Sequence, residues 1–302
     1  MIAALLAGLV CFSLFAGRLP SAWLAAVCLG TAAVFLFAKG HRHDSVLTMD
    51  IYARRSRLCR ENAALKTAGS LGLLLLCTCS ASPLPPLCLF CFLSAVTVAA
   101  GGIRPGEYLA LLKLPAMFLL LSALTLLWDF YRVLPQQAVV SLPLGGGWLA
   151  VVPAAQSVGM VVLSRALGAV SCLYFLSLST PLPELLEVLR RARIPAIVIE
   201  LAVLIYRYLF ILLATFREMR DSAASRLGYR GLKRSLRTTG LVYGGLLAGS
   251  FRRAGACFDA MESRCYTGQI RFLTEKKKVT AKGFFLLAVP LAGMLAGVCM
   301  GF

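Results

Sequence analysis

The stretch LPAMFLLLSALTLLWDFY, residues 114–131, decides the fold of this chain because it is apolar over nearly the length that a helix needs to cross a bilayer. Similar stretches occupy residues 1–17, 21–38, 65–82, 84–101, 156–178 and 283–302. Apolar types make up 59% of the 302 residues and charged types only 15%, so most of the chain can be buried only in lipid. We therefore predict an all-α integral membrane protein, a polytopic helical bundle with cytoplasmic amphipathic helices.

The positive charge is concentrated in two parts of the chain. The net charge is +18, and seven Lys or Arg lie within residues 39–66, nineteen within 190–282 and five elsewhere. By the positive-inside rule both basic segments are cytoplasmic. The N-terminus is then predicted inside, and the turn at Arg18, the loop 132–153 and the C-terminus outside. Within that loop, the run Leu144–Trp148 favours a short hairpin with an aromatic residue at the interface.

The first apolar run has the length of a secretory signal peptide. No positive region precedes it, however, and a second apolar run follows at once. We therefore expect the first run to be retained as a membrane span.

Residue types that bind metals are present but not arranged as a typical site. Several of the eleven cysteines, such as Cys77 and Cys79, fall inside apolar runs, where cysteine is usually a small apolar residue. We predict no zinc site and no structural disulfide. His41, His43 and Asp44 could bind a divalent metal transiently, since imidazole suits cobalt and nickel. The simpler interpretation of these three residues is a polar linker.

The pattern of the chain changes at Thr180, which can cap a one-faced helix. Pro181 and Pro183 are tolerated in its first turn, because those backbone nitrogens have no partner within the helix. The apolar residues recur at helical spacing as Leu182, Leu185, Leu186 and Leu189, and Arg190 complements the C-terminal dipole. Pro195 is expected to end this helix, which suits a membrane surface or a partner's groove.

Residues 197–216 are apolar but contain Glu200 and Arg207. Because a charge in mid-bilayer costs roughly 2.5 to 3.5 kcal/mol, we expect a long helix along or under the membrane. The alternative is an ordinary span with a buried ion pair. The helix is expected to continue to Arg226 and to end at Gly228, a common stop residue.

A short motif occurs twice in the second basic segment. Residues 221–226 and 259–264 both read Asp-x-x-x-Ser-Arg, so Ser225 and Arg226 correspond to Ser263 and Arg264. The second copy lies on a predicted helix whose apolar positions are Ala254, Cys257, Met261 and Cys265, with Gly268 as its stop. Two arginines at one helical phase suggest a docking surface for a repeated partner. The alternative is that they only help to set the membrane topology.

The second half of the chain resembles a known family. STPLPELLEVLRRARIP, ELAVLIYRYLFILLATFREMRDSAASRLGYRG and AMESRCYTG are similar to the transmembrane (T) component of energy-coupling factor (ECF) transporters, in its cobalt-transport CbiQ-type branch. MDIYARRSRLCRENAALK resembles the same branch, so the resemblance covers residues 48–302 and is strongest over 179–268. The domains expected from it are an extra N-terminal hairpin and linker at 1–47, membrane spans at 48–178, a coupling region at 179–278 and a last span at 279–302.

The resemblance implies a helical scaffold whose coupling helices bind two ABC-type ATPase subunits. Each signature of the family holds an arginine that docks in one ATPase, which here would be Arg226 and Arg264, with Ser225, Ser263 and Gly228 beside them. Leu185, Leu189, Arg190 and Met261 would support the coupling helices. Relative to the family's Ala-Arg-Gly signature, the first copy has an inserted Leu227, and Cys265 replaces glycine in the second.

The predicted function is that of a non-catalytic importer subunit in the cell membrane of a prokaryote. It would couple ATP hydrolysis by the two ATPases to uptake of a metal ion, cobalt in the first place and nickel or a vitamin as alternatives. The chain lacks a G-x-x-x-x-G-K-[ST] motif. ATPase closure is expected to pull the two arginines relative to each other. A substrate-capture membrane subunit and the lipid bilayer are the other expected partners; no cofactor and no nucleic acid are expected.

Two other classes of function are considered. A membrane enzyme acting on an anionic lipid-linked substrate would use the basic face for binding, but it usually needs clustered carboxylates, and the five aspartates are dispersed. A permease acting alone would need polar residues within its spans, where only Asp129 and Arg165 are expected, near the span ends.

Overall fold

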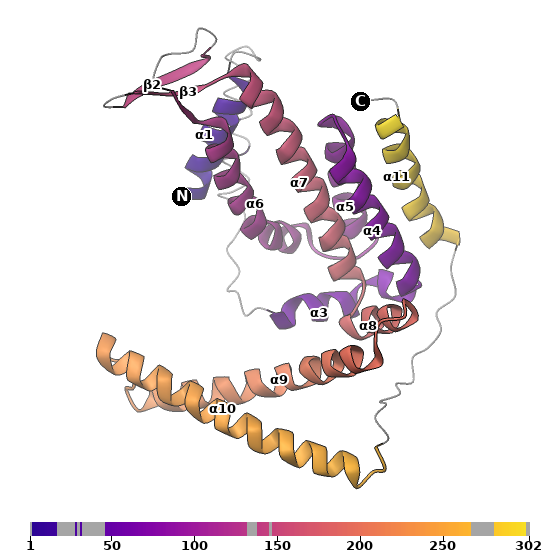
Figure 1. Ribbon diagram of the computed structural model, residues 1–302, viewed down its shortest axis with the longest axis vertical. Helices are drawn as coiled ribbons and strands as arrows, with labels where there is room; N and C mark the ends of the chain where they lie inside the picture. The colour runs from indigo at the N-terminus through magenta and orange to yellow at the C-terminus, as the bar shows by residue number, and fades with distance from the viewer. Residues whose placement is uncertain are drawn as a thin grey trace. The chain divides into compact units, whose positions relative to one another are not determined.

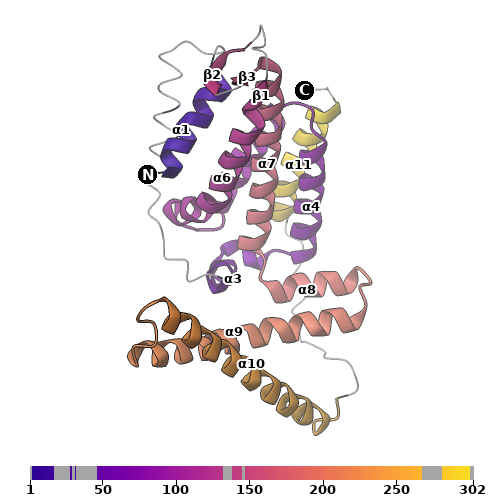
Figure 2. The same cartoon turned by 60° about the vertical axis from the view of Figure 1, so that its left-hand side comes forward.

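The chain divides into two units. Unit 1 consists of Met1–Pro181 and Lys276–Phe302, and unit 2 of Leu182–Glu275. The computed structural model, drawn in Figures 1 and 2, describes residues 2–16, 28, 31, 46–131, 138–144, 147–266 and 281–299. The predicted second span at 21–38, the residues His41, His43 and Asp44, and the predicted stop at Gly268 lie largely or wholly outside these residues.

Unit 1 is a helical bundle. Its elements are α1 (Ile2–Phe15), α3 (Val46–Arg55), the 3-10 helix η1 (Arg57–Arg60), α4 (Ala63–Cys79), α5 (Leu84–Ala99), α6 (Pro105–Leu127), α7 (Pro153–Ser179) and α11 (Ala281–Cys299). Helices α6 and α7 are long and apolar enough to cross a membrane, and α4, α5 and α11 are shorter apolar helices. The predicted class, an all-α integral membrane protein, is confirmed.

Helix α7 lies in the middle of unit 1, beside α4, α5 and α6 (Figures 1 and 2). A buried apolar cluster joins Leu73 of α4, Leu93 of α5, Phe175 of α7 and Met294 of α11. Gly168 permits this close packing, because a Cβ there would lie 2.6 Å from the Cys77 sulfur and 3.1 Å from a backbone oxygen. The apolar runs of the sequence therefore fold together around α7.

Among the described residues of unit 1, one charged side chain is buried. Lys66, in the first turn of α4, is only 3% exposed. Its ammonium group donates hydrogen bonds to the carbonyl oxygens of Leu58 at 3.0 Å and of Ser179, the last residue of α7, at 2.8 Å. A cation bound to the last carbonyl of a helix also interacts favourably with the helix dipole. Lys66 therefore joins η1, α4 and the end of α7.

The first helix packs against the rest of the bundle. Leu14 of α1 belongs to a buried cluster with Ala123 and Leu127 of α6. Gln156, at the start of α7, is buried and donates to the carbonyl oxygens of Ser13 and Ala16 at 2.9 and 3.0 Å. These carbonyls end α1 and would otherwise lack helical partners.

Arg165 lies in the middle of α7, and this position corrects the expectation that it stands near a span end. Its Nε donates to the carbonyl oxygen of Ser80, in the turn after α4, at 2.7 Å. The guanidinium therefore has a partner within the bundle.

A small antiparallel sheet connects α6 to α7. Its strands are β1 (Asp129–Tyr131), β2 (Val140–Leu144) and β3 (Gly147–Val151), in the order β1-β3-β2. The pairing of Leu144 with Gly147 confirms the predicted hairpin, and β1 was not predicted. The sheet and the C-terminal end of α11 lie toward one end of unit 1, and α3 toward the other (Figures 1 and 2).

The part of unit 2 that the structure describes, residues 182–266, forms three helices, α8 (Leu182–Arg191), α9 (Ala196–Ser225) and α10 (Leu232–Glu262). Thr180 was predicted to begin α8, but it caps the end of α7, where its N–H bonds to the oxygen of Leu176. Pro195 does not end α8; α8 ends at Arg191, and Pro195 is the residue before α9. The same residue types can serve either neighbouring helix, which explains both errors.

The two long helices of unit 2 differ in composition. Helix α9 has 30 residues and contains neither glycine nor proline, and it too is long and apolar enough to span a membrane. Helix α10 has 31 residues, of which only the last part was predicted, and it contains Gly240, Gly244, Gly245, Gly249 and Gly255. Glycine lowers helix propensity by about 1 kcal/mol relative to alanine, so packing must offset this cost in α10.

Candidate docking site

The two copies of the repeated motif end two different helices in the same way. We call residues 221–228 the first cap and residues 259–266 the second cap. In the first cap, the N–H of Gly228 bonds to the oxygen of Ala223 at 2.9 Å, and that of Leu227 to Ala224 at 2.9 Å. In the second, Tyr266 bonds to Met261 at 3.1 Å and Cys265 to Glu262 at 3.0 Å. This pair of bonds is the Schellman motif.

The left-handed residue of each cap is not a glycine. Leu227 has φ 56° and Cys265 has φ 58°, and each directly follows its arginine. Gly228 was predicted to end the helix, but the left-handed residue that ends it is Leu227, one position earlier. Leu227 is therefore not an insertion, because it occupies the position at which the signature has glycine. Cys265 occupies the same position in the second cap, with nearly the same φ.

Both arginines are available to a partner. Arg226 and Arg264 are exposed, and within the described part of the chain neither guanidinium has a hydrogen-bond or ion-pair partner. The neighbouring serines are used locally: Ser225 donates to the oxygen of Asp221 at 2.8 Å and Ser263 to that of Ala260 at 3.0 Å. The arginines are thus the groups of each cap that can bind an external carboxylate.

Gly228 is required for a different reason than the one predicted. The hydroxyl group of Thr238, on α10, donates to the carbonyl oxygen of Gly228 at 2.8 Å. A Cβ on Gly228 would lie 2.8 Å from the oxygen of Ala223 and 2.9 Å from the Thr238 methyl group. The glycine allows the close approach that attaches the first cap to α10.

The second cap is attached to α9 by a side chain. The hydroxyl group of Tyr266 donates to Oε2 of Glu200 at 2.9 Å. This hydrogen bond raises the pKa of Tyr266 above its ordinary value of 10.0, since it holds the hydroxyl proton. The pairing of Glu200 with Arg207, expected for a buried ion pair, is not observed among the described residues.

The two caps lie at opposite ends of the α9–α10 pair. Arg226 follows the last residue of α9, whereas Tyr266 of the second cap bonds near the start of α9. At 1.5 Å per residue, Glu200 and Arg226 are about 39 Å apart along the helix axis. Figures 1 and 2 show the two helices crossing, with the end of each toward the start of the other.

Comparison with known proteins identifies the family. The model of CbiQ, the cobalt transport protein, matches residues 55–275. The chain belongs to the CbiQ family. The match includes both caps and all of unit 2, and it confirms the resemblance found in the sequence.

Individual relatives agree with this assignment. An uncharacterized protein of Methanocaldococcus jannaschii is 27% identical over 241 residues, 80% of this chain and 88% of that protein. The putative fused cobalt transport protein CbiMQ of Methanocorpusculum labreanum is 30% identical over 230 residues, 71% of this chain and 36% of that protein. The cobalt transport protein CbiQ of Rhodobacter capsulatus is 29% identical over 199 residues, 64% of this chain and 82% of that protein.

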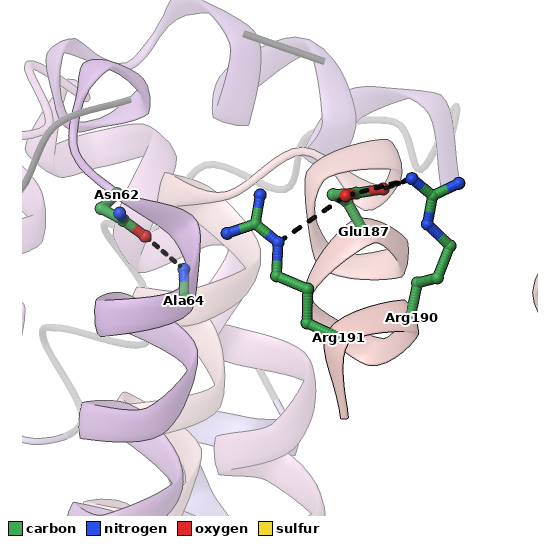
Figure 3. A network of polar contacts seen from close by, with 5 residues as sticks. All are labelled: Asn62, Ala64, Glu187, Arg190 and Arg191. Atoms are coloured by element: carbon green, nitrogen blue, oxygen red, sulfur yellow. Dashed lines mark hydrogen bonds and ion pairs between the residues drawn. The ribbon is translucent and has the colours of Figure 1, made fainter. Parts of the chain in front are cut away.

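In this CbiQ-family chain, the residues predicted to support the coupling helices differ in exposure, and Met261 accepts the N–H of Tyr266 in the second cap. Leu186 of α8 is buried, and Leu185 and Leu189 are half-buried. Arg190 and Arg191 lie on either side of Glu187, at 3.1 and 3.7 Å (Figure 3). Such exposed pairs contribute at most about 1 kcal/mol. The same figure shows the Asn62 side chain capping α4 through the Ala64 N–H.

Helix α10 also has an apolar face that sequence analysis missed. Leu232, Leu236, Tyr243, Leu247, Phe251 and Phe258 are spaced by four or seven residues, so they share one face. All six are strongly exposed; Phe251, for example, is 71% exposed. An exposed stripe of this kind marks a contact with a partner or with lipid. The helical spacing was readable in the sequence, but the glycines between these residues obscured it.

No group of three or more His, Cys, Asp or Glu side chains that could hold a metal ion occurs among the described residues. The predicted candidates His41, His43 and Asp44 lie outside those residues.

Proposed function

We propose that this chain is the scaffold subunit of an ECF-type importer, and that Arg226 and Arg264 each dock one ABC-type ATPase. The proposal is carried by Arg226 and Arg264, which are exposed and have no partner among the described residues. They stand at two helix ends with the same hydrogen bonds. One structure presented twice fits two copies, or two close relatives, of one partner. The CbiQ family is one of transport proteins, which favours this function over a lipid enzyme.

Arginine suits this role for two reasons. Its planar fork can bind a carboxylate through two hydrogen bonds, whereas lysine binds as a hydrated point charge. Each arginine also stands at a helix C-terminus, where the helix dipole stabilises a cation. ATP binding is assigned to the partner, because this sequence has no Walker A motif.

The apolar face of α10 is proposed to contact the substrate-capture membrane subunit. Leu247 and Phe251 lie near its centre, and Gly244, at the edge of this face, has open space around it that permits a close helix contact. The name of the Methanocorpusculum relative describes a fusion of CbiM with CbiQ, which supports a partner that works beside this chain.

Cobalt is the proposed substrate, from the names of the family and of the relatives, with nickel or a vitamin as alternatives. The docking face is proposed to be cytoplasmic, because nineteen of the cations lie within residues 190–282. By the same rule, the loop 132–153 and the C-terminus, outside the two basic segments, are proposed to lie on the other side.

Alanine variants of the two arginines test the proposal. In detergent, the tagged chain would be captured together with the ABC-type ATPase of its own organism's cobalt transporter, and cobalt uptake would be measured in vesicles. Each of Arg226→Ala and Arg264→Ala should weaken the interface by roughly 2 to 4 kcal/mol if the arginine is desolvated there. Arg252→Ala, which removes an exposed cation within α10, is the matched control. Unchanged capture and uptake in the double variant would refute the proposal.

A further inference from the structure

Glu200 occupies an unusual place in α9. It is the only acidic residue between Ala196 and Arg217, in a stretch that otherwise exposes apolar side chains such as Ile197, Leu201 and Ile205. A carboxylate in such a stretch disfavours membrane contact, so it requires a reason. One hydrogen-bond partner of its carboxylate is the hydroxyl group of Tyr266, at 2.9 Å.

Tyr266 forms hydrogen bonds through both its main chain and its side chain. Its main-chain N–H closes the second cap by bonding to the oxygen of Met261, and its hydroxyl group bonds to Glu200 on the other helix. Tyr266 is also the second residue after Arg264. The bond to Glu200 therefore fixes the end of α10 that carries this arginine to the start of α9.

The first cap has the equivalent attachment at the equivalent residue. Gly228 is the second residue after Arg226, and its carbonyl oxygen accepts the Thr238 hydroxyl. That attachment joins residues only ten apart, whereas Tyr266 and Glu200 are 66 residues apart.

Other contacts join the two helices farther from Arg264: Arg253 donates to the hydroxyl of Thr215 at 2.8 Å, and the rings of Phe216 and Tyr243 lie 5.5 Å apart. The Tyr266–Glu200 bond is the contact that holds the second cap itself to α9.

We infer that Glu200 and Tyr266 are positioning residues, whose hydrogen bond sets the spacing of Arg226 and Arg264 so that two ATPases can be bound at once. The inference rests on the proposed docking function. It assigns a role to two residues outside the repeated arginine motif, one of them an acid in the apolar part of α9.

The spacing can be measured without any ATPase. Spin labels at Ser222→Cys and Ala260→Cys occupy equivalent exposed positions in the last turns before the two arginines, in a background without other cysteines. Pulsed dipolar spectroscopy of the full chain in detergent should give one narrow distance. Tyr266→Phe should broaden the distribution clearly. Glu200→Gln keeps a hydrogen-bond acceptor and should broaden it less. Tyr131→Phe in unit 1 makes the same chemical change and should leave the distance unchanged.

The consequence for docking is measured by native mass spectrometry with the co-expressed ABC-type ATPase. Tyr266→Phe should weaken binding of one of the two ATPase copies about 5- to 10-fold, the effect of losing one partly exposed hydrogen bond. Binding of the other copy should stay as in the unchanged chain.

The outcomes distinguish a failure of this inference from a failure of the proposed docking function. A distance distribution unaffected by both Tyr266→Phe and Glu200→Gln overturns the inference, whatever the ATPases do. A broadened distribution with undiminished binding of both copies also overturns it. If the unchanged chain binds no ATPase, the proposed function fails, and with it the docking role of the bond.

Discussion

Leu227 and Cys265 share a left-handed backbone conformation, with φ 56° and 58°, and each stands directly after an exposed arginine. Leu227 and Cys265 have side chains that this conformation disfavours, and the cost is roughly 1 to 2 kcal/mol per residue. The Schellman hydrogen bonds of each cap hold the residue there.

Replacement by glycine should therefore stabilise each cap. We expect Leu227→Gly and Cys265→Gly to raise the free energy of unfolding by about 0.5 to 1 kcal/mol, since relief of the strain exceeds the entropy lost by glycine. Thermal unfolding in detergent measures this effect. Leu227→Ala keeps the strain and should not stabilise. A destabilised glycine variant would show that the half-exposed side chain of Leu227 packs more than its exposure suggests.

Gly228→Ala should have the opposite effect. Its methyl group would lie within 3.0 Å of the Ala223 oxygen and of the Thr238 side chain, so the cap must shift away from α10. Overpacking of this kind costs about 1 to 3 kcal/mol. Gly240→Ala is the matched control: its position on α10 is open, and alanine should be neutral or stabilise by about 1 kcal/mol. Chemical denaturation of the two variants should separate them, and equal stabilities would contradict the contact.

Lys66→Met should destabilise unit 1. The variant keeps the length of the side chain but leaves the carbonyl oxygens of Leu58 and Ser179 without the ammonium group. Leaving buried acceptors unsatisfied is expected to cost about 2 to 4 kcal/mol. Thermal unfolding provides the measurement, with exposed Lys233→Met as control. If Lys66→Met loses less stability than Lys233→Met, water has replaced the ammonium group.

The Tyr266–Glu200 bond should persist through neutral pH and fail in strong base. Because the pKa of Tyr266 is raised above 10.0, the stabilisation is fully present below pH 10 and is lost as the pH rises through the higher, folded-state pKa. The label distance between positions 222 and 260 should stay narrow from pH 6 to about 9.5 and broaden only beyond pH 10. In Tyr266→Phe the distance distribution should not depend on pH. If the chain that keeps Tyr266 shows a broadened distribution near neutral pH, the hydrogen bond to Glu200 is not what holds this distance.

If the apolar face of α10 binds the substrate-capture subunit, substitutions on it should weaken binding of that subunit and leave ATPase binding unchanged. Leu247→Ser combined with Phe251→Ser should reduce binding of the substrate-capture subunit at least 10-fold, since two exposed apolar anchors are removed. ATPase capture should remain. Leu241→Ser is the control, because Leu241 is equally exposed but lies on another face of α10. Co-purification of both partners measures the outcome, and joint loss of both would indicate misfolding of unit 2.

Much of this fold could be predicted because single residues do not decide it. Each of α4, α5, α7 and α11 is an apolar run that only a helix can bury in lipid. The hairpin at Leu144 was marked by consecutive glycines before Trp148. The amphipathic α8 was marked by leucines at helical spacing.

Other features depended on contacts that no local pattern carries. Five glycines argued against a helix of the length of α10, and packing against α9 overrides that local preference. The left-handed Leu227 is held by hydrogen bonds rather than chosen by residue type. Tyr266 and Glu200 meet across 66 residues, so their pairing has no periodic signal.

Because α9 contains neither glycine nor proline, it can move as one rigid rod within unit 2. A partner that moves its two binding sites apart cannot stretch a continuous helix of 30 residues, so it has to turn that helix. An arm of about 39 Å that turns by about 10° displaces its far end by about 7 Å. The work of closing two ATPases would reach the membrane as rotation of a rod, and the glycines of α10 are where the accompanying bend would be taken up.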